Sequence, residues 1–578
     1  MRFLLLLACL LLVVASGGLS LVLGWASYAD LERMGQLLYL ENQFARLPLA
    51  LTATRYAGLH AVLSGGLLAG AGATWCLLRQ SVYRQELRQL GGELRQAATH
   101  LRAAVGQLSR TEKTIGWGLL GLILGLRLGV LLSYGFRYDE LASYLFFVRE
   151  GPMVISSYYP VPNNHVFFNL CCSLLNPLLP DHPLLVMRLP SFLAAALGTG
   201  LSYVLLTYFS NFRVATLATG LFNLSPAGLL YAISGRGYYL QFVLIQLGFF
   251  AVVGLGSCRH YQRLGWLMLV MSSILGLYTI PTYAYPLASL LLGAALVLRP
   301  QPGQWKPLLA AAVLIVATST LLYLPVGTVS GWERLAGNAY VTPLSWTGFR
   351  ALALANIYEK IQEQFGVVRP VLLVGGALLA LVPMVLVRMP LAPTQRSLGW
   401  VTWAMLVAPM AFVVAQRTYP PGRAVVYLAY FGFLLVAIAA WYAGARFWRG
   451  RRWSGVVQWG LISTCVLGMA ALRFGSGVLA RILSSHHEET ELTEAWRWLA
   501  ARQPDRVFLG SYQLFFYYYA TRSPQALTLA DAPQPGRRYP YLVLPANQQA
   551  APTWTRPHSY RAVYRNDLVS IFALSSLR

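Results

Sequence analysis

Two adjacent carboxylic acids, Asp139 and Glu140, follow directly after an apolar run at 115–134 that is long enough to span a bilayer as a helix. Carboxylates at a membrane edge are costly unless they are solvated, paired or used in chemistry. Position alone leaves open that they are ordinary juxtamembrane charges. A carboxylate held there can also act as a general base that takes the proton from an attacking hydroxyl group. Asp139 and Glu140 are therefore the first candidates for catalytic residues.

Further residues that could complete such a site lie in loops on the same side of the membrane as this pair. Arginine, tyrosine, histidine and carboxylates recur in these loops. Acidic residues placed at random would not lie so consistently on one side of the membrane. The candidates for binding a substrate, or the phosphate of a donor, are Asn164, His165, Arg188, Arg236, Tyr238, Tyr283, Arg417 and Arg423.

A carboxylate beside several arginines at a membrane surface suits glycosyl transfer from a lipid-linked sugar. Asp139 would remove the proton of the acceptor hydroxyl as that oxygen attacks the anomeric carbon. Glu140 would position the acceptor or hold Asp139. The leaving group would be a polyprenyl phosphate, already a good anion, and arginine stabilises such charge in a low-dielectric site. No second acid is needed to protonate it, unlike in an inverting glycosidase.

The composition indicates the class of protein that must position these residues. Of the 578 residues, 57% are hydrophobic and 11% are charged, which is less than half of the roughly 25% charged residues in a soluble domain. This excludes a cytosolic enzyme, a disordered chain and a fibrous repeat, and it indicates a polytopic membrane protein. The net charge of +25 lies mostly in short loops between apolar runs. There it sets topology, so we expect no nucleic acid partner.

About thirteen apolar runs approach the ~20 residues that span a bilayer as a helix. The basic loops between alternate runs predict a cytoplasmic N-terminus and an extracytoplasmic C-terminus, as in a multi-pass protein of the bacterial inner (cytoplasmic) membrane. The first run could be a cleaved signal peptide, although its length favours a retained helix. The predicted spans are 3–24, 57–78, 115–134, 187–209, 214–232, 238–256, 264–280, 283–298, 307–326, 370–388, 399–415, 424–443 and 455–473.

The predicted fold is an all-α membrane protein with a small α/β domain at its C-terminal end. We expect a two-helix membrane hairpin at 1–79, a cytoplasmic amphipathic helix at 80–113, a transmembrane catalytic core at 114–474 and an extracytoplasmic domain at 475–578. In the tail, periodicity and turn residues predict helices at 491–501 and 514–520 and strands at 506–509, 527–529, 541–544 and 569–574.

The segment 80–113 is the one long polar helix that we expect. Leucines at 87, 94, 101 and 108 recur every seven residues. Two interpretations remain open: a helix that lies on the inner membrane surface, or a coiled-coil contact with a second copy or a partner.

Several of these motifs, in this order, resemble the outer-loop elements of the GT-C superfamily of membrane glycosyltransferases. The matching segments are Tyr-Asp-Glu at 138–140, Asn-Asn-His-Val-Phe-Phe-Asn at 163–169, Arg-Leu-Pro-Ser at 188–191, Ser-Gly-Arg-Gly-Tyr at 234–238 and Tyr-Pro-Pro-Gly-Arg at 419–423. The group includes protein O-mannosyltransferases, lipid A aminoarabinose transferases and bacterial transferases of lipopolysaccharide core sugars.

The resemblance implies an inverting transferase with a polyprenyl-phosphate sugar donor and a lipid, glycan or protein acceptor. It implies that Asp139 is the base, with Glu140 its neighbour, and that Arg236 binds the lipid phosphate. Rival interpretations are a lipid-linked glycan transporter or flippase, a polysaccharide polymerase or ligase that uses the same kind of donor, and a membrane-anchored scaffold.

No cofactor is certain from the sequence, but a divalent metal is a candidate. The segment at 163–165 departs from the pattern of the family, in which some members have a basic residue nearby that contacts the donor phosphate. His165 could do the same, or it could bind a metal. The segment 486–489, His-His-Glu-Glu, could also bind a metal, although a solvated linker explains it as well.

Overall fold

Long apolar helices dominate the computed structural model of this chain. It describes residues 1–37, 48–301, 303–337, 342–365, 373, 375–447, 460, 463–464, 468, 474–523, 527–532, 537–555 and 558–576. Within these residues, eight helices are long and apolar enough to cross a membrane, by length and composition. They are α1 (Arg2–Leu23), α3 (Ala53–Arg79), α5 (Arg110–Ser133), α9 (Pro183–Phe209), α12 (Tyr238–Ser257), α14 (Ala284–Leu298, with the turn that precedes it), α15 (Trp305–Leu322) and α20 (Pro393–Gln416).

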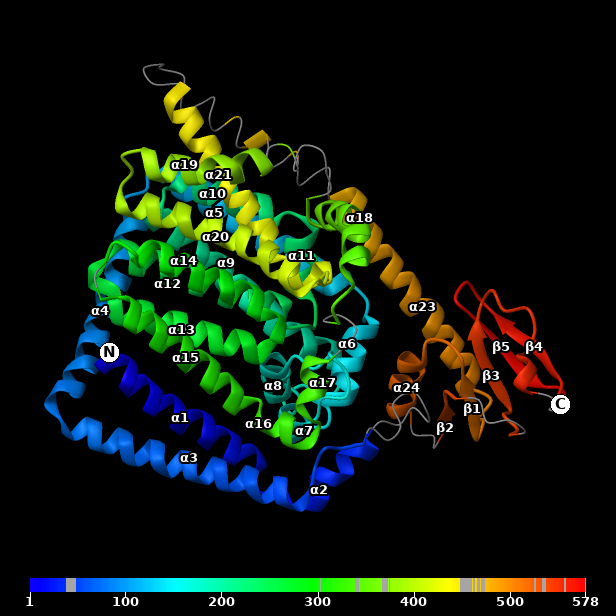
Figure 1. The fold of residues 1–578 in the computed structure, drawn as a ribbon. Helices are drawn as coiled ribbons and strands as arrows, with labels where there is room; N and C mark the ends of the chain where they lie inside the picture. Colours follow the sequence, from blue (N-terminus) through cyan, green and yellow to red (C-terminus); the bar gives the residue numbers. More distant parts are fainter. Residues whose placement is uncertain are drawn as a thin grey trace.

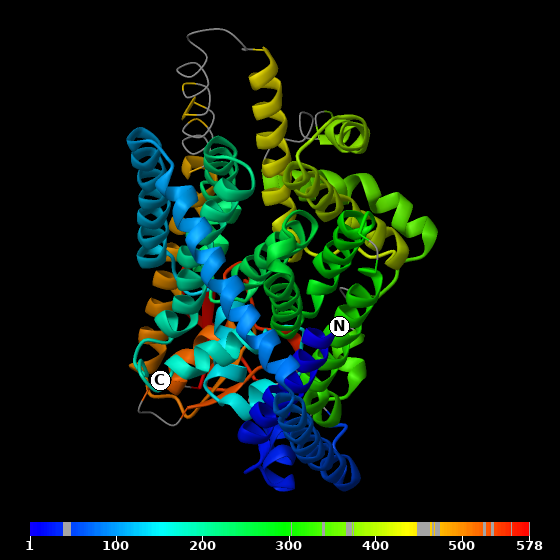
Figure 2. The same cartoon turned by 90° about the vertical axis from the view of Figure 1, so that its left-hand side faces the viewer.

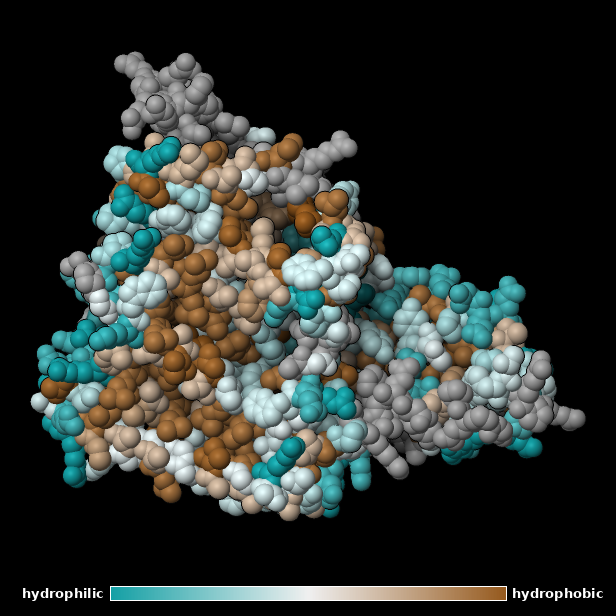
Figure 3. Space-filling view, viewed as in Figure 1, coloured by the Kyte–Doolittle hydropathy of each residue, from teal (hydrophilic) through white to brown (hydrophobic). Residues whose placement is uncertain are grey.

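A ninth span is formed if α10 (Phe212–Asn223) and α11 (Pro226–Ile233) are counted together, although they meet at a bend of 69°. The chain is therefore a multi-pass membrane protein, and a broad apolar face over the helix bundle is visible in Figure 3. Of the other four predicted spans, three correspond to α13 (Gln262–Thr279), whose first turn is polar, and to the shorter apolar parts of α19 (Gly376–Arg388) and α21 (Tyr427–Phe447). The span predicted at 455–473 lies almost wholly outside the described residues.

Short helices connect the spans at the end of the bundle that carries the C-terminal domain, while α4 lies at the opposite end (Figure 1). They are α2 (Tyr28–Glu32), α6 (Tyr138–Ser143), α7 (Pro152–Ser157), α8 (Val166–Leu175), α16 (Leu324–Val329), α17 (Trp332–Ala336) and the longer α18 (Trp346–Phe365).

Helix α4 (Ser81–Gly106) is the predicted polar helix, and it crosses the ends of other helices in Figure 2. Arg263, at the start of α13, forms ion pairs with Glu86 at 2.6 Å and Glu93 at 3.1 Å. Leu101 and Leu108 pack against the bundle core, whereas Leu87 and Leu94 are exposed. The heptad leucines thus divide between a contact with the bundle and a free face.

The C-terminal domain combines α23 (Ala480–Ala500) and α24 (Gln513–Thr521) with a five-stranded sheet of order β2-β1-β3-β5-β4. Strand β1 pairs in parallel with β2 and β3, and β5 pairs in antiparallel fashion with β3 and β4. All four predicted strands are confirmed, and one strand was missed because its alternation is weak. The strands are β1 (Arg506–Leu509), β2 (Thr528–Ala530), β3 (Tyr541–Pro545), the missed β4 (Tyr560–Arg565) and β5 (Val569–Leu574).

A buried arginine holds the bend between α10 and α11. Arg127 of α5 is 1% exposed and donates hydrogen bonds to Asn223 Oδ1 and Tyr239 Oη, both at 2.5 Å, and to Thr199 Oγ1 at 2.9 Å. It also reaches the carbonyl oxygen of Gly228, in the first turn of α11, at 3.3 Å. A break in a membrane helix frees backbone groups that need partners. Arg127 supplies donors on both sides of this break.

Replacing Arg127 with methionine should destabilise the bundle by roughly 3 kcal/mol or more, because Asn223 and Tyr239 lose a buried partner at about 1–3 kcal/mol each. Thermal unfolding of the purified protein in detergent measures this. Arg110→Met, at an exposed position of the same helix, is the matched control and should change stability little. Equal unfolding temperatures for the two variants would contradict the assigned role of Arg127.

Candidate functional site

Asp139 and Glu140 lie in the first turn of α6, just after the extended segment that leaves α5. The backbone N–H of Arg137 donates to Glu140 Oε2 at 3.1 Å, so Glu140 caps the helix that carries both acids. Acidic groups in a first helical turn are also favoured by the helix dipole. The local sequence therefore explains why a helix begins here, but not why the two acids end in different environments.

Glu140 is buried in a two-bond ion pair. Arg188, near the start of α9, donates from Nε to Glu140 Oε1 at 3.2 Å and from Nη2 to Oε2 at 2.7 Å, and both side chains are at most 2% exposed. Arg188 also donates to the carbonyl oxygens of Tyr134 and Gly135, and the N–H of Gly235 donates to Glu140 Oε1. The carboxylate thus joins three segments that are distant in the sequence.

Ser191 extends this joint one turn along α9, where its Oγ donates to the carbonyl oxygen of Arg236 at 3.1 Å. Glycines flank Arg236 because the chain passes close to its neighbours. A Cβ at Gly235 would lie 2.8 Å from Met187 Cβ, and one at Gly237 would lie 2.7 Å from Thr279 Cγ2. The Arg-Leu-Pro-Ser segment therefore fixes the loop that carries Arg236.

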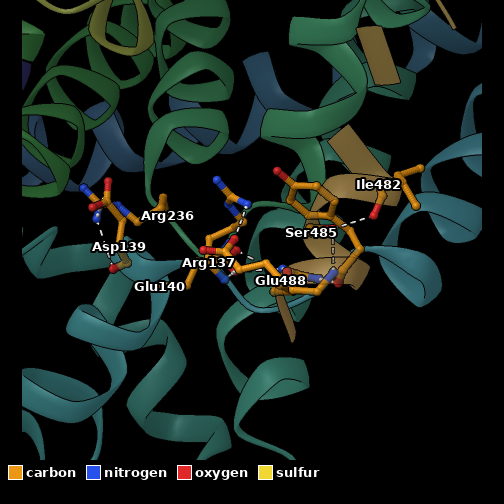
Figure 4. A network of polar contacts seen from close by, with 11 residues as sticks. Arg137, Asp139, Glu140, Arg236, Ile482, Ser485 and Glu488 are labelled. Carbon is orange, nitrogen blue, oxygen red and sulfur yellow. Dashed lines mark hydrogen bonds and ion pairs between the residues drawn. The ribbon is translucent and has the colours of Figure 1, made fainter. Parts of the chain in front are cut away.

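Asp139 faces the other way and remains half exposed. Its Oδ2 lies 3.5 Å from Arg236 Nη1 and 3.7 Å from Arg423 Nη1. The Arg236 side chain is almost fully buried, and it also donates to the Asp139 carbonyl oxygen at 3.2 Å and to Asn163 Oδ1. Figure 4 shows Asp139 and Arg236 next to each other. One accessible carboxylate is therefore held between two guanidinium groups.

His165 continues the cluster on the far side of Arg236. Its Nδ1 accepts the backbone N–H of Gly237 at 2.9 Å, so the neutral ring carries its proton on Nε2. That atom lies 3.2 Å from Arg236 Nη2, and the ring contacts Tyr238 edge-on at 4.9 Å. Two donors that face each other in a buried place form a pair that an anionic oxygen can bridge.

Three other predicted site residues make their contacts elsewhere in the structure. Asn164 is buried, and its Nδ2 donates to the carbonyl oxygens of Ile155 and Tyr158. These bonds stabilise the loop that carries Asn164. Tyr283 is fully buried in the bundle core. Arg417 stacks over the ring of Trp346 at 5.6 Å.

Asn163 is a site residue that the prediction did not include. It accepts from Arg236 and donates to the Asp139 carbonyl oxygen at 3.3 Å. It belongs to the Asn-Asn-His segment, but two adjacent asparagines cannot be told apart by spacing.

The C-terminal domain contacts the segment that leads into α6. Glu488 of α23 forms an ion pair with Arg137 at 3.0 Å, and Ser485 Oγ accepts the N–H of Gly135 at 3.1 Å (Figure 4). The rings of Phe136 and Tyr518 meet edge-on at 5.6 Å. The catalytic candidate therefore lies two residues from an interdomain contact.

Among the described residues, Asp139 and His165 belong to no group of three ligand residues that lie close together. Sites for catalytic zinc use three protein ligands. In the part of the chain that the structure describes, the group of three close ligand residues is His487, Glu491 and Asp567, in the C-terminal domain.

No protein-family model matches this chain, and no curated protein matches it. Among solved structures, ArnT from Cupriavidus metallidurans in the apo state is similar, with a TM-score of 0.48 and 13% identity over 79% of this chain and 98% of that chain. The same protein bound to undecaprenyl phosphate gives a TM-score of 0.44 and 13% identity, over 80% and 99%.

The archaeal oligosaccharyltransferase AglB from Archaeoglobus fulgidus, in complex with an inhibitory peptide and a dolichol-phosphate, is also similar. It gives a TM-score of 0.44 and 12% identity, over 76% of this chain and 70% of that chain. At these identities the likenesses assign no residue roles.

Amide substitution of the two adjacent acids should change the stability of the protein by very different amounts. Glu140→Gln leaves the buried Arg188 without its counter-charge, and it should lower the free energy of unfolding by about 3–5 kcal/mol. Asp139→Asn, at a half-exposed position, should change stability by about 1 kcal/mol or less. Denaturation of both variants in detergent measures the difference, and a stable Glu140→Gln protein would contradict the structural role of this ion pair.

His165 should make the protein acid-labile. Burial, and then the charges of Arg236 and Arg423, hold the pKa of His165 well below its usual 6.5. The unfolded chain therefore binds a proton below about pH 6.5 that the folded chain does not, and the free energy of unfolding falls as pH drops.

Unfolding temperatures between pH 7.5 and 5.5 test this prediction. His165→Asn keeps an acceptor for Gly237 and should reduce the loss on acidification. His182→Asn, at the exposed residue just before α9, should behave like wild type. An unchanged pH slope in His165→Asn would show that other groups cause the lability.

Proposed function

We propose that this protein is an inverting glycosyltransferase that moves a sugar from a polyprenyl-phosphate donor to a lipid, glycan or protein acceptor on the extracytoplasmic face. The observation that carries the proposal is the accessible carboxylate of Asp139 between Arg236 and Arg423, at the end of a membrane helix bundle. A base and anion-binding groups are the two elements that this reaction needs in one place.

In the proposed reaction, Asp139 takes the proton of the acceptor hydroxyl as its oxygen bonds to the anomeric carbon. The bond from that carbon to the phosphate oxygen breaks at the same time, and the phosphate leaves as an anion. The negative charge of the leaving phosphate is stabilised by Arg236, Arg423 and the Nε2–H group of His165. Attack opposite to the leaving phosphate inverts the anomeric centre.

The ion pairs of Asp139 are long, so a donor phosphate could replace this carboxylate at the two guanidinium groups. At 3.5 Å and 3.7 Å they exceed the 2.7–2.9 Å of a strong charge-assisted hydrogen bond. A donor phosphate that binds Arg236 and Arg423 closely would compete for these guanidinium groups and leave Asp139 to the acceptor. In this proposal Glu140 serves the reaction by positioning α6, because its oxygens are already bound.

The polyprenyl carrier is proposed from the chemistry of the site, a phosphate-binding cluster beside an apolar bundle. Undecaprenyl phosphate and a dolichol-phosphate, which are lipids of this class, are present in the structures of ArnT and AglB named above.

The extracytoplasmic side is proposed from charge. Basic residues of α4 and of the α12–α13 connection lie at the end of the bundle opposite to α6, and basic loops favour the cytoplasm. That assignment puts Asp139 and the C-terminal domain outside the inner membrane.

A transporter or flippase is disfavoured by the environment of Arg127. Ionisable residues within the membrane often mark a transport pathway, but both terminal nitrogens of this side chain donate to neutral oxygen atoms at the helix bend. A polymerase or ligase that uses the same donor class shares the proposed site and differs in its acceptor.

Asp139→Asn should reduce sugar transfer by about 10²–10⁴-fold, the usual contribution of a general base. A deletion strain profiled for envelope glycans by mass spectrometry, and then complemented, measures this. Asp181→Asn, at an exposed acid between α8 and α9, is the matched control and should restore the lost glycan. Full restoration by a normally expressed Asp139→Asn protein would overturn the catalytic role.

A further inference from the structure

A second cluster with ligand chemistry lies in the C-terminal domain, where α23 meets the turn between β4 and β5 (Figure 1). His487 and Glu491 are four residues apart on α23, which places them on one face of the helix. Asp567 comes from the turn. One ligand atom from each of the three residues lies within 4.8 Å of the other two.

The charges of this cluster are unbalanced. Within the described residues, no lysine or arginine forms an ion pair with Glu491 or Asp567, and the nearest positive candidate is the His487 ring, 3.2 Å from Asp567 Oδ2. Arg565, two residues before Asp567, donates instead to Ser570 and to the Gln548 carbonyl oxygen. In a chain with a net charge of +25, two carboxylates have gathered without a fixed cation.

Hydrogen bonds tie the turn that carries Asp567 to Glu491. The N–H of Asp567 donates to Glu491 Oε2 at 3.2 Å, and Asn566 Nδ2 donates to the Glu491 carbonyl oxygen at 2.8 Å. The side chains of His487 and Asp567 are 52% and 76% exposed, so water has access to the cluster.

We propose that His487, Glu491 and Asp567 bind a divalent cation, with zinc as the metal that best fits the donor set. One imidazole and two carboxylates supply mixed nitrogen and oxygen ligands, which suit zinc better than magnesium or calcium. Two carboxylates and a neutral imidazole carry a charge of −2, which a divalent ion balances. Tetrahedral zinc with bonds of about 2.1 Å places its ligands about 3.4 Å apart, close to the present spacing of His487 and Asp567.

The ion would join the sheet to the helix that contacts the proposed active site. On the same helix, Ser485 and Glu488 bind Gly135 and Arg137, next to α6. Bound metal would therefore fix, within the C-terminal domain, the helix that makes these contacts. The proposal does not depend on the glycosyl transfer, since it concerns other residues and another domain.

Zinc titration of the full-length protein in detergent tests the site, after treatment with EDTA and its removal. Calorimetry should show one equivalent of zinc that is lost, or weakened at least about tenfold, in His487→Gln and in Asp567→Asn. The same zinc concentration should raise the unfolding temperature of wild type and not of these variants.

His486→Gln is the matched control, because His486 is the exposed neighbour of His487 on α23. This variant should bind zinc like wild type, and magnesium should not compete at equal concentration. Equal zinc binding by wild type and the two ligand variants would overturn the proposal. So would loss of the site in His486→Gln, because a different ligand set would then hold the metal.

Discussion

Arg188 reaches from the start of α9 to Glu140 and binds it with two hydrogen bonds in a place from which solvent is excluded. Neither charge could remain there alone, since an unpaired buried ion is strongly destabilising. The remaining donors of Arg188 bind carbonyl groups at the end of α5, and Gly235 completes the shell of Glu140. The requirement to satisfy one buried carboxylate thus brings α6, α9 and the loop before α12 together.

The arrangement around Asp139 is a consequence of that joint. Once Glu140 points into the bundle, Asp139, one residue earlier on the same turn, points away from it. The loop held by Gly235 delivers Arg236 to its side, and Ser191 fixes the Arg236 backbone. Two chemically similar acids consequently take different roles, one in holding the fold and one in facing the site, and only their surroundings distinguish them.

The arginines of the bundle show three ways to accommodate a guanidinium group in an apolar body. Arg127 is neutralised by no acid among the described residues and instead binds neutral oxygens across a helix bend. Arg188 is paired and saturated. Arg236 is buried but directs Nη2 towards the His165 ring, another donor. The same Nη2 lies 3.4 Å from Tyr238 Oη, and two donors side by side suit the binding of an anion.

The sequence determined the class of protein, because too few charged residues cannot cover a soluble body of this size. It also determined four of the five strands of the tail, where turn residues and alternation are local signals, and the side of the bundle on which Asp139, His165 and Arg236 would gather. The tertiary structure decided what spacing cannot express. It placed Tyr283 in the bundle core and Arg417 over Trp346, buried Glu140, brought in Asn163 and bent the span at 214–232. These outcomes depend on contacts between residues far apart in the sequence, such as Arg236 and Asp139, which are 97 residues apart. The free energy of such contacts comes from pairing and burial that no local pattern records.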